Sequence, residues 1–203
     1  MPGVSFENLI AAGRSGHLIS FPTDTVPALA ARPDRASLIY QAKQRDLSKP
    51  IILMMAEIDQ LWDYVLGSLE ERQQWQYLMH RHWPGALTLV LPASDRVSPE
   101  MNPLNPGTIG VRVPDHDLAR RILAQTGALA TTSANQSGQP ALLEMSAIAQ
   151  QFPEAYQLAI EPGGEESARL SGTAASGTPS TVVKWAGQGW QLLRQGAIAI
   201  EAS

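Results

Sequence analysis

Short apolar segments alternate with amphipathic segments along the whole 203-residue chain, and this alternation constrains the fold most strongly. Short apolar runs that end at proline or polar residues are typical of buried strands. The amphipathic segments repeat their apolar residues every three or four positions, as helices do. No internal repeat and no convincing linker interrupts the series. The chain is therefore predicted to be one α/β domain over residues 1–203, with a mixed parallel and antiparallel sheet and flanking helices.

Turn and capping residues set the limits of the expected elements. Strands are predicted at 17–21, 51–55, 86–91, 109–113, 128–132, 156–160, 180–185 and 190–195. Helices are predicted at 6–12, from Asp34 to about Lys43, at 68–83, 117–127 and 144–151. Ser68 and Glu71 have the spacing of a capping box, Asp34 is a candidate N-cap, and Gly127 is a candidate C-terminal stop. The proline-rich segment 92–108 and the glycine-rich segment 161–179 are predicted loops, the second a candidate lid.

The composition excludes several classes of function. The chain has no cysteine, which excludes disulfides, thiolate metal sites and cysteine nucleophiles. Its formal net charge is −4, whereas nucleic-acid-binding domains are usually basic, so a polyanion is expected to bind only at a local patch. No signal peptide and no run of about 18 apolar residues is recognisable, so we expect a cytoplasmic protein with no membrane span.

Positive charge is concentrated in the segment KQRDLSKPI, residues 43–51. It holds Lys43, Arg45 and Lys49, which include two of the three lysines in the chain. Lys43 and Arg45 would diverge on a helix but lie on one side of an extended chain. They can therefore bind one ligand, such as a polyphosphate, only if the helix ends near Lys43. The alternative is a solvated helix end, where cations interact favourably with the helix dipole.

Polar residues follow two other predicted strands. FPTDTVPALA (21–30) places two threonines and an aspartate between prolines, and TTSANQSG (131–138) offers hydroxyl and amide groups. Arg112 and Arg194 lie inside apolar strands, where arginine is rarely unpaired. Each is expected to have a carboxylate or phosphate partner, either from the protein or from a ligand. Ordinary polar turns and internal salt bridges are the alternatives.

Several familiar sites are absent from the sequence. The four histidines lack the spacing of a zinc site, and neither of the common glycine-rich phosphate loops occurs. The residues that flank Ser133 do not match the Gly-x-Ser-x-Gly motif of serine hydrolases. No metal-binding residues are therefore predicted.

Seven strings, in order, resemble the YrdC family of threonylcarbamoyl-AMP synthases. They are PTDTV, KQRDLSKPI, RHWPGALTLVL, IGVRVPDH, TSANQSG, PSTVV and LLRQGAI, and they extend over nearly the whole chain, from about residue 17 to 197. The resemblance implies a short, single-domain form. It also implies a twisted mixed sheet curved around a large, locally positive cavity.

The resemblance also implies an activity. The family converts L-threonine, bicarbonate and ATP to threonylcarbamoyl-AMP and pyrophosphate, and Mg²⁺ is expected on the phosphates. A separate tRNA threonylcarbamoyl transferase complex then modifies tRNA, so this complex, with a weak direct tRNA contact, is the implied partner. No dedicated catalytic nucleophile is implied, because positioning and cations carry this kind of chemistry.

Residues that match the family's motifs are assigned by the same resemblance. Those implied for the nucleotide are Lys43, Arg45, Lys49, Thr108, Ser133, Asn135 and Arg194. Those implied for L-threonine are Thr23, Arg112, Thr132 and Ser180.

Two departures from the family pattern leave alternatives open. The family usually continues PTDTVYGLG, whereas this chain has Pro27, Ala28, Leu29 and Ala30 after Val26, and Lys184 replaces a usual aspartate after PSTVV. The first change affects the implied threonine pocket. One alternative is an RNA-binding module without synthase activity, although the acidic balance argues against it. Another is a carbamoyl-adenylate-forming relative.

Overall fold

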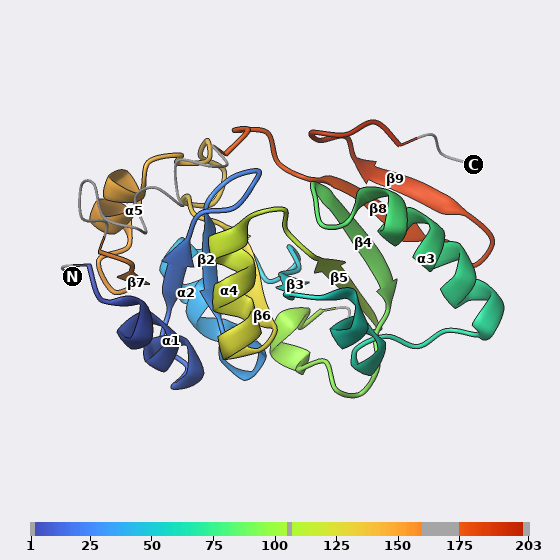
Figure 1. Cartoon of the computed structure of the whole chain (residues 1–203), viewed down its shortest axis with the longest axis horizontal. Coiled ribbons are helices and arrows are strands. Elements are labelled where there is room, and N and C mark those ends of the chain that lie inside the picture. Colours follow the sequence, from blue (N-terminus) through green and yellow to red (C-terminus); the bar gives the residue numbers. More distant parts are fainter. Residues whose placement is uncertain (1–2, 105–106, 160–174, 201–203) are drawn as a thin grey trace.

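The structure is a computed structural model, which describes residues 3–104, 107–159 and 175–200. Nine strands in this part form one sheet, in the order β7-β1-β2-β6-β3-β5-β4-β8-β9. The edge strands β7 and β9 lie at opposite ends of the long axis (Figure 1). The strands are β1 (Ile19–Phe21), β2 (Ala28–Ala31), β3 (Ile52–Met54), β4 (Leu87–Pro92), β5 (Thr108–Arg112), β6 (Leu129–Ser133), β7 (Tyr156–Gln157), β8 (Thr181–Trp185) and β9 (Trp190–Arg194).

The sheet is mixed, as the sequence predicts. The pairs β1–β7, β3–β5 and β4–β8 are parallel, and the remaining neighbours are antiparallel. The helices are α1 (Phe6–Arg14), α2 (Ser37–Lys43), α3 (Leu69–His82), α4 (Asp117–Thr126) and α5 (Met145–Gln151), with short 3₁₀ helices at Pro33–Arg35, Ile58–Asp63 and Pro99–Met101. In the described ranges no helix has the length and apolar character needed to cross a membrane.

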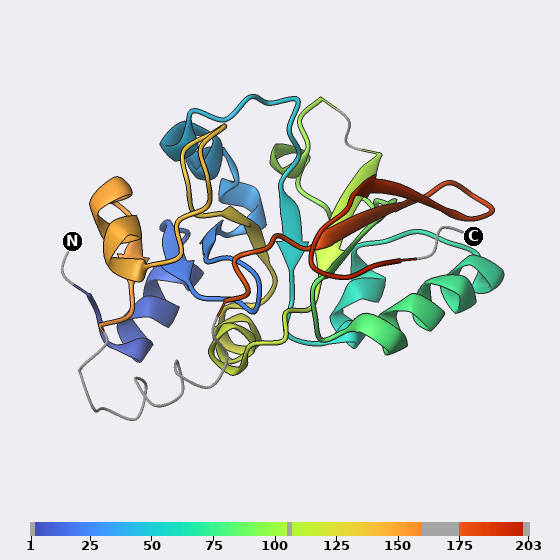
Figure 2. The ribbon, with the colours of Figure 1, turned by 90° about the horizontal axis from the view of Figure 1, so that it is seen from above.

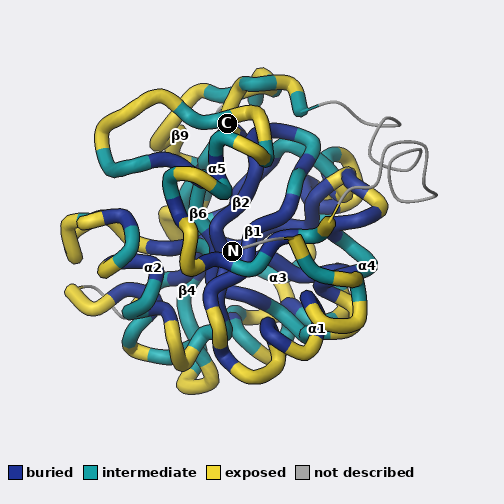
Figure 3. Tube along the Cα trace, turned by 90° about the vertical axis from the view of Figure 1, so that its left-hand side faces the viewer, coloured by how far each residue is buried: buried dark blue, intermediate teal, exposed yellow. Residues whose placement is uncertain are grey.

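The two faces of the sheet carry separate cores. Successive residues of β2 alternate between them: Ala28 and Ala30 belong to one cluster, Leu29 and Ala31 to the other. Helices α1 and α4 cover the first face, and α2, α3 and α5 contribute to the second. Figure 2 shows α4 and α2 on opposite sides of the central strands. The tube through β1 and β2 is buried almost throughout (Figure 3).

Local capping signals set three helix ends as predicted. Ser68 and Glu71 form the capping box of α3, and α4 ends at Gly127, whose φ is +83°. Helix α2 ends at Lys43, because Gln44 adopts a left-handed conformation with φ of +48°. The Arg45 N–H then donates back to the Tyr40 carbonyl at 2.9 Å, as in a Schellman motif. The helix thus ends between Lys43 and Arg45, as is required if both are to serve one ligand.

Three expectations differ from the structure. No strand is predicted at 28–31, yet these residues form β2. Asp34 does not cap α2, because its carboxylate accepts from the Arg32 guanidinium at 3.0 and 2.5 Å, and the N-cap is Ala36. Within the predicted loop 92–108, Pro99–Met101 form a 3₁₀ turn. The two end residues of the loop, Pro92 and Thr108, belong to β4 and β5. Most of the predicted lid, 161–174, and residue 160 of the predicted strand 156–160 lie outside the described residues.

Candidate active site

A cavity of about 390 Å³ opens on the central part of the sheet. Strand pairing explains which residues line it, because paired residues face the same side. One row across the sheet runs Thr131–Ile52–Gly110–Val90, and all four line the cavity. The volume is within the range of roughly 300–1,000 Å³ that is typical of small-molecule sites.

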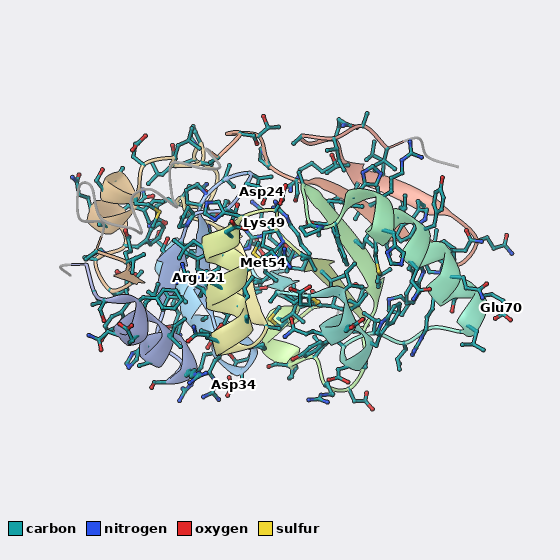
Figure 4. The ribbon with its side chains drawn as sticks, viewed as in Figure 1. Asp24, Asp34, Lys49, Met54, Glu70 and Arg121 are labelled. Atoms are coloured by element: carbon teal, nitrogen blue, oxygen red, sulfur yellow. The ribbon has the colours of Figure 1, made fainter. Side chains whose placement is uncertain are left out.

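Glycine at position 110 keeps the floor of this cavity deep. A Cβ atom there would lie 2.9 Å from the Ile52 Cγ2 atom and 3.5 Å from the Thr88 Cγ2 atom. Met54 lines the same floor from β3. Figure 4 shows Met54, Asp24 and Lys49 in the middle of the molecule in this view, whereas Glu70 lies at the far end of α3.

Three arginines line the cavity, and main-chain carbonyls hold each of them. Arg45 donates to Lys49 O at 2.9 Å and to Pro50 O at 3.0 Å. Arg194 donates twice to Ser180 O, at 3.1 and 2.8 Å, and Arg112 donates to Gly85 O at 3.0 Å. Arginine has five N–H donors, so each guanidinium is fixed while some donors remain for a ligand. The positive charges are therefore preorganised.

The three guanidinium groups also act on one another. Burial lowers the pKa of Arg45, Arg112 and Arg194. The charge of Arg194 lowers the pKa of Arg45 and of Arg112 further. Arginine nevertheless stays protonated in proteins. Like charges held together in a partly buried cavity favour a multiply charged anion.

Arg112 has a carboxylate partner from the protein itself. Its guanidinium donates to Asp24 Oδ1 at 2.6 Å and to Thr25 Oγ1 at 2.7 Å. The two charged side chains are only 4% and 10% exposed. The sequence left open whether the partner of Arg112 was a protein group or a ligand, and the structure supplies Asp24. Two N–H groups of Arg112 remain unused by these bonds.

Lys43 lies behind the cavity wall instead of in it. Its side chain is 1% exposed, and its ammonium group donates to the Ser133 carbonyl. Burial, with a smaller contribution from the charge of Arg45, lowers the pKa of Lys43 to about 7. Lys43 therefore supports the turn after β6 and changes its charge near neutral pH.

The turn after β6 presents an amide oxygen without a partner. Asn135 Nδ2 donates to Gln136 O at 2.9 Å and to Gln139 O at 2.6 Å. The Asn135 Oδ1 atom is buried and has no hydrogen bond to any described residue. Ser180 and Thr88 also line the cavity, and their hydroxyl groups form a hydrogen bond of 2.9 Å. The wall thus combines fixed cations with neutral acceptors.

The structure brings most of the sequence-predicted site residues together. The cavity is lined by Arg45, Thr108, Arg112, Thr132, Ser133, Asn135, Ser180 and Arg194. Lys43, Lys49 and Thr23 do not line it: Lys49 is exposed, and the buried Thr23 hydroxyl donates to Val26 O at 2.8 Å within its own loop. Thr25 and Thr131, which belong to the polar strings 21–30 and 131–138 but were not assigned individually, also line the cavity. Sequence reasoning missed Thr88, Asn102 and Gln139, which carry no comparable signal.

No group of three or more His, Asp or Glu side chains in the described ranges is placed to hold a metal ion. The cavity is dominated by cations and neutral oxygens. It therefore suits an anionic ligand that brings its own metal ion better than a resident metal centre.

Comparison with known proteins gives relatives over most of the chain. Residues 11–196 match the Sua5/YciO/YrdC family, described as "Telomere recombination". The threonylcarbamoyl-AMP synthase of Bacillus subtilis (strain 168) is 34% identical over 193 residues, which are 93% of this chain and 52% of that protein. The enzyme of the same name from Vibrio campbellii is 32% identical over 169 residues, 81% of this chain and 89% of that one. The chain spans about half the length of the Bacillus relative.

Solved structures agree with these sequence matches. Sua5 of P. abyssi, complexed with L-threonine, superposes with a TM-score of 0.77 at 31% identity, covering 92% of this chain and 52% of that one. E. coli YciO gives a TM-score of 0.75 at 22% identity and covers 96% and 92% of the two chains, which supports the fold alone. The extent of the sequence match, together with this fold, shows that the chain belongs to the Sua5/YciO/YrdC family.

Proposed function

We propose that this protein is an L-threonylcarbamoyladenylate synthase, a nucleotidyltransferase that makes threonylcarbamoyl-AMP and pyrophosphate from L-threonine, bicarbonate and ATP. One observation carries the proposal. Arg45, Arg112 and Arg194 share a cavity with the Ser133–Asn135 turn, in a chain whose relatives bear the name of that enzyme. Fixed cations around neutral hydrogen-bonding groups suit a nucleoside triphosphate beside a small amino acid.

The nucleotide part of the site is assigned to the side with Arg45 and Arg194. Their anchored guanidinium groups offer remaining N–H donors to phosphate oxygens, and Ser133, Asn135 and Thr108 offer neutral partners. Lys43 supports Ser133 from behind, and Lys49 adds charge at the exposed rim. Charge-assisted hydrogen bonds to phosphate are about twice as strong as neutral ones.

The amino acid part is assigned to the region of Arg112. Its guanidinium suits the α-carboxylate of L-threonine, and Thr132 and Ser180 are polar groups of the same cavity. Thr23 acts indirectly, because its hydroxyl meets the Thr25 hydroxyl, 3.2 Å away, and Thr25 contacts Arg112. Val26 and Ala28 provide apolar wall, and Ala28 belongs to the segment that departs from the family pattern.

The reaction needs positioning more than a nucleophilic side chain. The threonine nitrogen, after losing its ammonium proton, bonds to the carbon of bicarbonate, and water leaves. A carbamate oxygen then attacks the α-phosphorus, and the bond to the β-phosphate oxygen breaks as pyrophosphate departs. Negative charge on the phosphoryl oxygens is stabilised by the preorganised arginines, which need no reorganisation during the step.

Mg²⁺ is expected with the nucleotide. The ion prefers oxygen ligands and usually keeps few protein ligands, so phosphate oxygens would hold most of it. The side-chain Oδ1 atom of Asn135 has no hydrogen bond to any described residue and is a neutral oxygen in the cavity wall that could serve as one ligand of the ion. When bound, the ion would neutralise charge on the phosphates.

The product is proposed to pass to a tRNA threonylcarbamoyl transferase complex in the cytoplasm, with at most a weak direct contact to tRNA. The proposed function is tested by giving the purified protein ATP, bicarbonate and L-threonine and following pyrophosphate. Release is expected only when all three are present. Release that does not depend on L-threonine would contradict the proposal.

A further inference from the structure

His116 has a buried ring nitrogen without a partner. It is the N-cap of α4, where its Nδ1 accepts from the Ala119 N–H at 3.4 Å. The residue is 3% exposed, and no described residue hydrogen-bonds to its Nε2 atom. An acceptor role for Nδ1 places the proton of the neutral ring on Nε2. His116 therefore holds a buried N–H donor that lacks an acceptor, which is an unfavourable arrangement.

Asp24 is the acidic residue whose charge acts most strongly on His116, and the β1–β2 loop that carries it lies beside the N-terminal end of α4 in Figures 1 and 2. Burial lowers the pKa of His116, and the Asp24 carboxylate opposes this more strongly than the sequence neighbours Asp115 and Asp117 do. Asp24 uses its Oδ1 atom for Arg112, whereas its Oδ2 atom has no hydrogen bond to any described residue. The Asp24 carboxylate thus contacts one cation, Arg112, and acts through its charge on His116, to which it makes no hydrogen bond.

The contact with Asp24 has a cost for ligand binding at Arg112. Arg112 lines the cavity, but a carboxylate of the protein already neutralises it. A ligand carboxylate that binds there meets the repulsion of Asp24, because two like charges would share one guanidinium.

We propose that Asp24 exchanges partners, pairing with Arg112 in the empty cavity and with the Nε2–H of His116 when the α-carboxylate of the amino acid substrate binds Arg112. His116 is then a positioning residue for the amino acid site. In the exchange, the ligand carboxylate neutralises Arg112 in place of Asp24. The Asp24 carboxylate then accepts a hydrogen bond from the buried Nε2–H group of His116, which otherwise lacks an acceptor. The identity of the ligand as L-threonine rests on the proposed function.

The exchange also predicts which ligands produce it. A ligand must carry a carboxylate to displace Asp24. L-Threoninol keeps the ammonium and hydroxyl groups of L-threonine but lacks that carboxylate, so it should leave Asp24 on Arg112. If a ligand instead bound only the unused N–H groups of Arg112, His116 would keep its unpartnered nitrogen.

Nitrogen-15 NMR of the histidine rings tests this directly in the intact 203-residue chain. With L-threonine, the Nε2–H proton of His116 should move downfield as it gains a carboxylate acceptor, and with L-threoninol it should not move. The signal can be assigned by its loss in His116→Asn. An unchanged His116 signal at saturating L-threonine, or the same shift with L-threoninol, would overturn the exchange.

The variant His116→Asn supplies a second, independent measurement. Asparagine is among the best N-cap residues, so α4 keeps its cap while the imidazole is lost. We expect the Kd for L-threonine to rise roughly tenfold, the loss expected for one charge-assisted hydrogen bond, with the Kd for ATP and the melting temperature unchanged. Equal L-threonine affinity at equal stability would overturn the role of His116. Failure of the wild-type protein to bind L-threonine would overturn the proposed function as well.

Discussion

The buried ammonium group of Lys43 donates a hydrogen bond to the main-chain carbonyl of Ser133. This bond joins the last residue of α2 to the last residue of β6. The two elements reach the cavity from different parts of the chain, and Arg45 and Asn135, each two residues further on, line it. Lys43 thereby couples the cationic segment to the polar turn.

This bond predicts a pH dependence of stability. Burial lowers the pKa of Lys43 from 10.5 to about 7, so between these values the unfolded chain binds more protons than the folded protein. Stability contributed by this group therefore rises as the pH increases above 7. Urea unfolding at pH 6.5 and 9 should give a gain of up to about 2.5 kcal/mol from this group. Lys43→Met should lack that gain, and equal pH slopes in both proteins would contradict the assignment.

Removing single cations should weaken nucleotide binding selectively. We expect Arg45→Ala to raise the Kd for ATP more than tenfold, because a lost charge-assisted contact costs roughly 1.5–3 kcal/mol. Lys43→Ala should raise the Kd for ATP more than tenfold as well, because it removes the donor that holds the Ser133 carbonyl from behind the cavity wall. Arg96→Ala is the matched control, since Arg96 is largely exposed and pairs with Asp63 outside the cavity. Titration calorimetry checks the three variants. ATP affinity that survives in both Lys43→Ala and Arg45→Ala would rule out their proposed role.

The fold was largely predictable because its signals are local. The capping box of Ser68 and Glu71 and the glycine stop at Gly127 are visible in a few residues each. Strand β2 was missed because the sequence ALAA has no β-branched or aromatic residue. Its strand conformation depends on pairing with β1 and β6, which are contacts made by tertiary structure.

The site was less predictable because its key contacts are distant in sequence. Asp24 and Arg112 are 88 residues apart, and Lys43 and Ser133 are 90 apart. Sequence patterns indicated that Arg112 needed an anionic partner but could not identify Asp24. The separation of Lys43 from the cavity also depends on packing between α2 and β6. The missing partner of His116 depends on packing as well, since it is visible only once Asp24 and α4 are placed.

The buried ion pair of Asp24 and Arg112 predicts a non-additive pair of substitutions. Asp24→Asn should lower the free energy of unfolding by roughly 3 kcal/mol, because it leaves the Arg112 charge buried without a counter-ion. Adding Arg112→Met should recover part of that loss, since no buried charge then remains. Denaturant unfolding of the single and double variants forms the cycle. Strictly additive losses would mean that the pair is not coupled.

Gly196 allows a close approach of two main-chain segments beside the cavity. A Cβ atom there would lie 2.2 Å from Pro179 O and 2.5 Å from Ser180 O. Because Ser180 O accepts from Arg194, Gly196→Ala should displace that arginine as well. We expect a loss of roughly 1–3 kcal/mol in unfolding free energy and weaker ATP binding. Unchanged values of both quantities would show that the approach is looser than described.

The proposed function requires the cavity to join L-threonine, bicarbonate and ATP into one adenylate. The most direct test incubates the protein with L-threonine, ATP, Mg²⁺ and ¹³C-bicarbonate and analyses the nucleotide products by mass spectrometry. We expect threonylcarbamoyl-AMP that carries one ¹³C atom, in an amount strongly reduced in Arg45→Ala but not in Arg96→Ala. Absence of the labelled adenylate from a protein that binds both ATP and L-threonine would rule out the proposed synthase activity.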